Sequence, residues 1–146
     1  MVDYAPSFTE GEMVGKGVIV TCVSGGAIAK GRFVKLSSGT GETPTVVVCG
    51  NYENVFGVAL KAAAGAGEYI PVLVRGIVKM TLGTVSGTLA AGSAVRSNAE
   101  GLPEHLPDQA VDEGGTATYT IYYNAKAGVT MQNGATGDKI LILVGK

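Results

Sequence analysis

Charge is scarce in this 146-residue chain, because charged residues make up 16% of it, against roughly 25% in an ordinary globular domain. The chain has 11 Lys+Arg and 12 Asp+Glu, which gives a formal net charge of -1. Binding to a phosphate backbone depends on clustered positive charge, so we expect no direct nucleic-acid partner. A surface rich in small uncharged residues suits burial against other copies or a partner. A compact barrel with polar uncharged loops would explain it equally well.

Long apolar runs and a leader pattern are also missing. The longest apolar stretches, residues 55–60 and 140–144, are far shorter than the roughly 20 residues that a helix needs to cross a membrane. No Lys or Arg precedes Lys16, and the first residues contain no apolar core of a secretory signal. We therefore expect no membrane partner.

Cysteine and histidine, which build most metal sites, are nearly absent. Cys22 and Cys49 are the only two cysteines. Without a secretory signal they are more typical of buried free thiols than of a disulfide. His105 is the only histidine, so the three residues cannot supply the four ligands of a structural zinc site.

The residues of common enzyme sites do not occur together in this sequence. His105 lies between two prolines, and no serine stands in a Gly-x-Ser-x-Gly turn. Glu10 and Glu12 are the nearest pair of acids by spacing, and nothing encloses them. The glycine-rich loops lack the Lys-Ser/Thr ending of a phosphate loop. We expect no catalytic residues, no metal and no cofactor.

The sequence is instead rich in glycine, with 23 copies, and in short runs of Val, Ile, Thr and Tyr. Such runs bounded by glycines predict β-strands, and their number predicts an all-β fold, a small Gly-rich β-barrel or sandwich. The nine predicted strands are residues 17–23, 32–36, 45–49, 55–60, 69–75, 76–82, 94–97, 116–123 and 139–144.

Four similar turns precede strands, each with a glycine that can adopt a positive φ without a Cβ penalty. They lie at residues 29–34, 65–70, 90–95 and 135–140. Their spacing is too irregular for a solenoid, so they indicate turn chemistry for a small barrel. The runs at 70–74 and 140–144 are apolar at nearly every position. This pattern predicts burial on both faces, by the core and by a neighbouring layer or subunit.

We divide the chain into an extended N-terminal arm, residues 1–12, and a single β domain, residues 13–146. The arm carries Tyr4, Pro6 and Phe8 among polar neighbours, so it is either a docking segment or a frayed terminus. Residues 98–115 contain five acids and two prolines and predict a long acidic loop, either a partner contact or a solvated excursion.

The order of these elements resembles the head-decoration, or capsid cement, proteins of tailed bacteriophages. The resemblance covers roughly residues 11–97. It rests on Gly15-Lys16-Gly17-Val18-Ile19-Val20, Val55-Phe56-Gly57-Val58-Ala59-Leu60, Gly67-Glu68-Tyr69-Ile70-Pro71-Val72, Val74-Arg75-Gly76-Ile77-Val78 and Leu89-Ala90-Ala91-Gly92-Ser93-Ala94-Val95.

The resemblance implies a structural virion protein that assembles as a homotrimer on the outer surface of the expanded capsid. There it would bridge neighbouring major capsid proteins and stabilise the shell. Under this hypothesis Tyr4, Pro6 and Phe8 contact the capsid. The strand that carries Ile70, Val72, Val74 and Arg75 would lie at the subunit interface.

An alternative from another class is a carbohydrate- or ligand-binding β module, for example a virion adhesion protein. Its site would consist of Tyr119, Tyr122, Tyr123 and the acidic loop.

Overall fold

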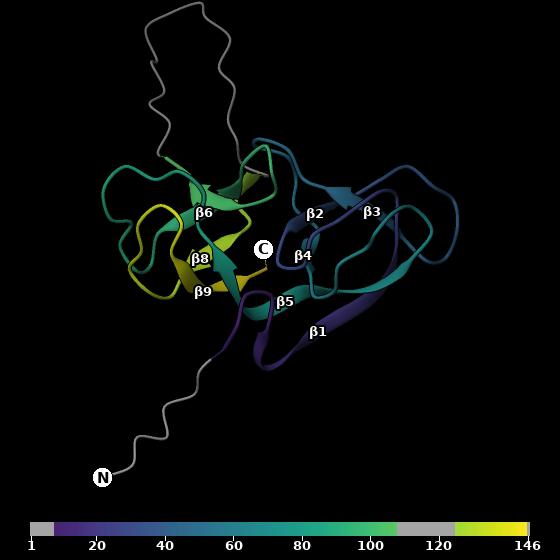
Figure 1. Cartoon of the computed structure of the whole chain (residues 1–146), viewed down its shortest axis with the longest axis horizontal. Coiled ribbons are helices and arrows are strands. Elements are labelled where there is room, and N and C mark those ends of the chain that lie inside the picture. The colour runs from purple at the N-terminus through teal and green to yellow at the C-terminus, as the bar shows by residue number, and fades with distance from the viewer. Residues whose placement is uncertain (1–7, 108–124, 146) are drawn as a thin grey trace, which may run out of the picture.

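The computed structural model describes residues 8–107 and 125–145 and shows an all-β protein, as the sequence predicts (Figure 1). No α-helix occurs among these residues. The strands are β1 (Met13–Ser24), β2 (Phe33–Leu36), β3 (Thr45–Val48), β4 (Gly57–Ala59), β5 (Tyr69–Thr81), β6 (Ala94–Ser97), β7 (Pro103–His105), β8 (Gly128–Thr130) and β9 (Lys139–Val144).

The first part of β5 and four other strands pair with one another in a closed ring. The pairings run β1–β3–β2–β4–β5 and return from β5 to β1. All are antiparallel except the short contact of β1 with β3, which is parallel at Val23 and Ser24. In Figure 1, β2, β3 and β4 lie on one side of β5, and β6, β8 and β9 lie on the other.

The second part of β5 begins another set of strands, in the order β5–β9–β8–β6–β7. Its last strand, β7, returns toward β5 because the Gly83 amide donates to the Pro103 carbonyl at 2.9 Å. The same kind of bond joins the Gly25 amide to the Val46 carbonyl, at 2.8 Å, in the ring. Both sets of strands therefore close in the same way.

The two sets are repeats of one arrangement, which we call the first half (residues 18–75) and the second half (residues 76–145). Strands β1, β2, β3, β4 and early β5 correspond to late β5, β6, β7, β8 and β9. The registers match residue by residue: Val34↔Gly57 corresponds to Val95↔Gly128, Ala59↔Val72 to Thr130↔Ile142, and Cys22↔Ile70 to Met80↔Ile140.

The four turns found in the sequence are two equivalent pairs in this repeat. Gly31, with a φ of 83°, corresponds to Gly92, with a φ of 87°. Their amides donate to the equivalent carbonyls of Ala59 and Thr130, at 2.8 and 2.7 Å. The turns at Gly67 and Gly137 form the second pair, with φ values of 87° and 83°. The pattern that predicted turn chemistry is thus also the trace of an internal repeat.

The apolar side chains form two core clusters that lie on opposite faces of the strands. Val34, Ile70 and Val72 belong to a cluster in the first half, whereas Phe33 and Leu73 belong to a larger cluster that extends through the second half. Adjacent strand residues point to opposite faces, so this chain's own residues cover β5 on one face at Ile70 and Val72 and on the other face at Leu73.

Some predicted strand boundaries differ from the structure. The predicted strands at 69–75 and 76–82 are one strand, β5, because Gly76 keeps the chain in the sheet with a φ of 149°. Strands β7 and β8 were not predicted, since each has three residues and begins with a proline or a glycine. The predicted strand at 116–123 lies outside the described residues. Residues 103–105 belong to the sheet although they fall within the predicted acidic loop.

Candidate docking surfaces

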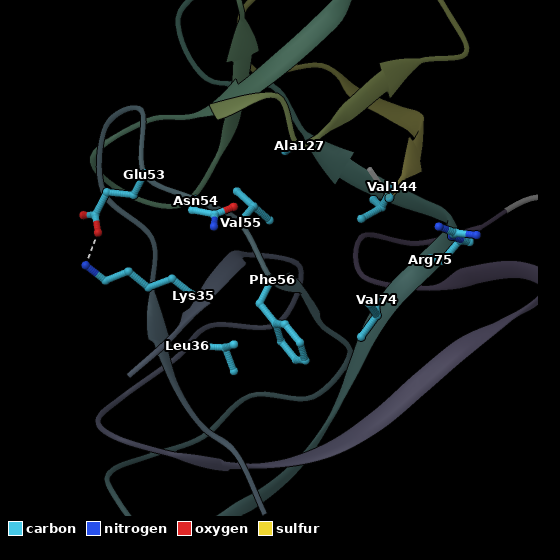
Figure 2. Close-up of a pocket in the computed structure, with 11 residues that line it drawn as sticks. Lys35, Leu36, Glu53, Asn54, Val55, Phe56, Val74, Arg75, Ala127 and Val144 are labelled. Carbon is cyan, nitrogen blue, oxygen red and sulfur yellow. Dashed lines mark hydrogen bonds and ion pairs between the residues drawn. The ribbon is translucent and has the colours of Figure 1, made fainter. Parts of the chain in front are cut away.

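A pocket of about 660 Å³ lies between the two halves (Figure 2). Its apolar wall comes from the β2 end, the segment before β4, the middle of β5 and the end of β9. The lining residues are Lys35, Leu36, Glu53, Asn54, Val55, Phe56, Val74, Arg75, Ala127, Val144 and Gly145. Leu36 is 53% exposed, which is high for a leucine side chain.

Equivalent positions of the repeat meet across this pocket. Val74 and Val144 occupy the same place in their strands, as the registers of β5 and β9 show. Phe56 and Ala127 are also equivalent, because their amides donate to the matching carbonyls of Val34 and Val95, both at 2.8 Å. The first half thus contributes the large side chain and the second half the small one, which leaves the hollow between them.

Charged groups lie at the rim of the pocket. The Lys35 ammonium pairs with the Glu53 carboxylate, and the Gly50 amide also donates to that carboxylate at 3.0 Å. Arg75 is exposed on the opposite side, as Figure 2 shows. The pocket therefore has an apolar floor with the Lys35–Glu53 pair at one side and the Arg75 side chain at the other, which suits a protein surface better than a reacting substrate.

Two of the four predicted interface residues are buried, and the other two are accessible. Ile70 and Val72 are 1% and 0% exposed and pack inside the first half. Their side chains cannot reach another subunit, because this chain's own strands already cover them. Val74 and Arg75 follow in the same strand and line the pocket, where they are accessible.

Of the predicted capsid-contact residues, Tyr4 and Pro6 lie outside the described residues. Phe8 is described and is half-buried. The residues that follow it attach to the domain, because the Gly11 amide donates to the Lys79 carbonyl at 2.7 Å. The Thr9 amide donates to the Glu12 carboxylate at 3.1 Å, and this bond, with Lys30 and Lys79 nearby, lowers the pKa of Glu12 below its ordinary value.

A buried polar cluster fastens the two halves to each other. Arg96 pairs with Glu104 at 3.2 Å, and each side chain is only 14% exposed. The guanidinium also lies 4.0 Å from the ring centroid of Tyr52, a residue of the first half. The Tyr52 amide donates to the Ser97 carbonyl at 3.2 Å, and Tyr52 adopts a positive φ of 57°. The sequence placed Glu104 in an acidic loop, but its charge is neutralised within this chain.

Cys22 and Cys49, the two thiols that could act as nucleophiles, belong to different core clusters. His105 is exposed at the end of β7. Cys22 and Cys49 are both buried thiols that no disulfide joins, as predicted, and burial raises the pKa of the Cys22 thiol. Within residues 8–107 and 125–145 there is no cluster of metal-ligating side chains and no helix long and apolar enough to span a membrane. Tyr119, Tyr122 and Tyr123 lie outside the described part of the chain.

Sequence reasoning singled out Val74 and Arg75, whose place at a subunit interface stays a prediction, and it named no other residue of the pocket as a site residue. Leu36, Phe56 and Ala127 come from distant parts of the chain and meet only because the halves pack against each other. The resemblance motifs included Val55 and Phe56 beside Val74 and Arg75, and this was the available signal.

Comparison with known proteins gives one family and one fold. A family model for phage cement proteins matches residues 13–145. Among solved structures, the chain is similar to the head fiber gp8.5 N base in bacteriophage phi29, with a TM-score of 0.62 and 11% sequence identity. That alignment covers 87% of this chain and 92% of the other. A comparison with curated proteins finds no match.

Proposed function

The chain belongs to the phage cement protein family and is a structural protein of the virion, and from this premise we propose that it binds the outer surface of the expanded capsid. It stabilises the shell there by bridging neighbouring major capsid proteins. The observation that carries this proposal is the extent of the family match, since residues 13–145 include every described strand.

The physical basis of the proposed activity is linkage. A protein that binds the expanded shell but not its precursor adds its binding free energy to the expanded state alone. Many copies on one shell combine contacts that are individually modest into a large resistance to disassembly. No reacting group is required, which agrees with the dispersed positions of His105, Cys22 and Cys49.

We propose the surface around the pocket as the interface of a homotrimer. Val74, Arg75 and Leu36 are accessible there, and the hollow between Phe56 and Ala127 can receive a side chain from the next copy. A ring of three copies requires two different surfaces to meet, and a pocket that accepts a projecting group is one of them. Ile70 and Val72 would support this interface only by holding β5 in place.

The capsid contact is assigned to Tyr4, Pro6 and Phe8. Aromatic side chains contribute large buried area at interfaces and often supply most of the binding energy. Phe8 is the described member of this set, and it directly precedes the turn that attaches to Lys79.

Co-sedimentation with shells of the parent phage that lack this protein tests the proposal. We expect saturable binding to expanded shells and none to unexpanded precursors, together with a higher temperature of shell disassembly. A variant lacking residues 2–7 should lose binding while it keeps its melting temperature. Equal binding to both kinds of shell would contradict the stabilisation mechanism. Binding to glycans in the absence of any shell would favour a ligand-binding module instead.

A further inference from the structure

The open edge of β1 has no equivalent elsewhere in the repeat. On one side β1 pairs with β5 through residues that include Val20 and Cys22. On its other side it pairs with β3 only at Val23 and Ser24. The backbone groups of Ile19 and Thr21 point to that second side, because the Val23 amide points there to the Pro44 carbonyl and groups alternate along a strand. Among the described residues nothing pairs with them there.

The corresponding edge of the second half is covered. Its residues Ile77 and Lys79 are equivalent to Ile19 and Thr21, because they pair with Leu143 and Leu141 as Ile19 and Thr21 pair with Leu73 and Pro71. The covering segment is residues 11–14. The Gly11 amide donates to the Lys79 carbonyl at 2.7 Å, the Lys79 amide donates to the Glu12 carbonyl at 3.1 Å, and Val14 pairs with Ile77.

This difference leaves apolar side chains exposed. The register of β1 shifts between Val14 and Val18. The first residues of β1 therefore pair with the second-half part of β5, and the residues from Val18 onward pair with its first-half part. Val18 is 54% exposed and Ile19 is 45% exposed, whereas Ile77 is half-buried. Natural proteins usually protect such edges with charge, proline or a covering segment. Thr21 and Ile19 carry none of these.

We propose that the β1 edge, residues 18–21, receives an extended segment of the major capsid protein as an added antiparallel strand. Residues 11–14 show what fits an edge of this geometry: a short segment that ends in two extended residues, Met13 and Val14, and places an aliphatic side chain opposite Ile77, the equivalent of Ile19. Main-chain hydrogen bonds to Ile19 and Thr21 supply affinity, and contact with Val18 and Ile19 supplies selectivity for apolar residues. This inference rests on the proposed function.

A second copy of the chain fits this edge less well. The other end of the sheet, β7, has three residues, begins with Pro103 and already bonds to Gly83. A second copy could therefore offer, among its described strands, only its own β1 edge. That pairing joins identical surfaces, and it gives a dimer rather than the ring of three copies proposed above.

Two substitutions and one control test the edge. Thr21→Pro removes the outward amide but leaves the β5 pairing of Val20 and Cys22, and Ile19→Lys places a charge on the edge without touching the core. Leu143→Lys is the control, because Leu143 is equally exposed, at 46%, but lies on β9, which is paired on both sides. Each variant is measured for its affinity for expanded shells, its solution mass and its melting temperature.

We expect Thr21→Pro and Ile19→Lys to weaken shell binding by about tenfold or more, and Leu143→Lys to leave it within about twofold. The solution mass should not change. Wild-type affinity in both edge variants would overturn the proposal, and so would a reduced mass, which would make the edge a contact between copies. If Thr21→Pro fails to fold, Ile19→Lys decides. Failure of the wild-type chain to bind shells would instead remove the proposed function, and this inference with it.

Discussion

The two halves of the molecule share one backbone arrangement but differ in what they leave accessible. Their strands pair in the same registers and their turns use glycines with the same φ. In the second half, residues 11–14 cover the outer edge of late β5. Arg96, the residue equivalent to Lys35, forms a largely buried ion pair there. The first half has an open edge at Ile19 and an accessible pair between Lys35 and Glu53. The shared pairing thus makes the fold, and the departures from it lie at the surfaces that we propose for docking.

The largest expected loss of stability comes from substitutions of the equivalent glycines at which two strands approach closely. A Cβ on Gly57 would meet the Leu73 carbonyl, and one on the equivalent Gly128 would meet the Leu143 carbonyl. We expect Gly57→Ala and Gly128→Ala each to cost more than about 4 kcal/mol of unfolding free energy, because a backbone group cannot move aside. Urea unfolding measures this cost. Gly26→Ala, which adds a methyl group in open space, should stay within about 0.5 kcal/mol. Equal stability of all three variants would refute the close backbone approach at both glycines, and a high cost at only one of the two would refute their equivalence.

Two leucines at equivalent positions sharpen the comparison, because only one is buried. Leu73 is 0% exposed and Leu143 is 46% exposed. Leu73→Ala should cost about 3–5 kcal/mol through a cavity in the larger cluster. Leu143→Ala should cost less than about 1 kcal/mol. Thermal unfolding of both variants checks this, and similar costs would mean that the second half is more enclosed than described.

Lys35 and Arg96 are also at equivalent positions, and loss of the more buried ion pair, that of Arg96, should cost more unfolding free energy than loss of the accessible pair. Arg96→Ala removes the charged partner of the largely buried Glu104 carboxylate, which keeps only neutral donors from Asn98 and Thr84, so we expect a loss of about 2–3 kcal/mol. Lys35→Ala breaks an accessible pair and should cost less than about 1 kcal/mol. Denaturant midpoints compare the two variants. A Glu104→Gln, Arg96→Ala double variant as destabilised as the sum of its single variants would show that the pair does not act as a unit.

The smallest expected effect on stability comes from Glu12, in the segment that covers the edge of the second half. The folded-state pKa of Glu12 is lowered by the bond from Thr9, so its contribution to stability is present above the ordinary Glu pKa and is lost as pH falls through the folded value. An NMR titration should place the Glu12 carboxyl below the ordinary value. Thr9→Pro removes the amide donor and should raise the midpoint, and an unchanged midpoint would exclude this cause.

Much of the fold could be predicted from the sequence, and the errors have physical reasons. The strands at 94–97 and 139–144 were predicted with the correct ends. The second is a run of Ile, Leu and Val that ends at Gly145, a pattern with few alternatives to a strand. The internal repeat was recognised only as similar turns, since equivalent residues such as Phe56 and Ala127 differ in type. The stretch between β7 and β8 is also longer than that between β3 and β4.

The proposed docking surfaces were harder to predict, because an apolar run in the sequence does not show whether this chain or a partner covers it. Ile70 and Val72 were assigned to a subunit interface on their two-sided apolar pattern, but a core cluster of this chain's own residues buries both side chains. Val74 and Arg75 of the same run do reach the surface. The open edge at Ile19 depends on strand pairing between distant residues, which no local pattern contains.

Electron cryomicroscopy of expanded shells saturated with the chain tests the central claim most directly. The account predicts density for the β domain on the outer surface, in contact with at least two neighbouring major capsid proteins, and with a shell segment along β1. Shells without external density, or with the chain bound to a single capsid subunit and no neighbour, would contradict a cementing role.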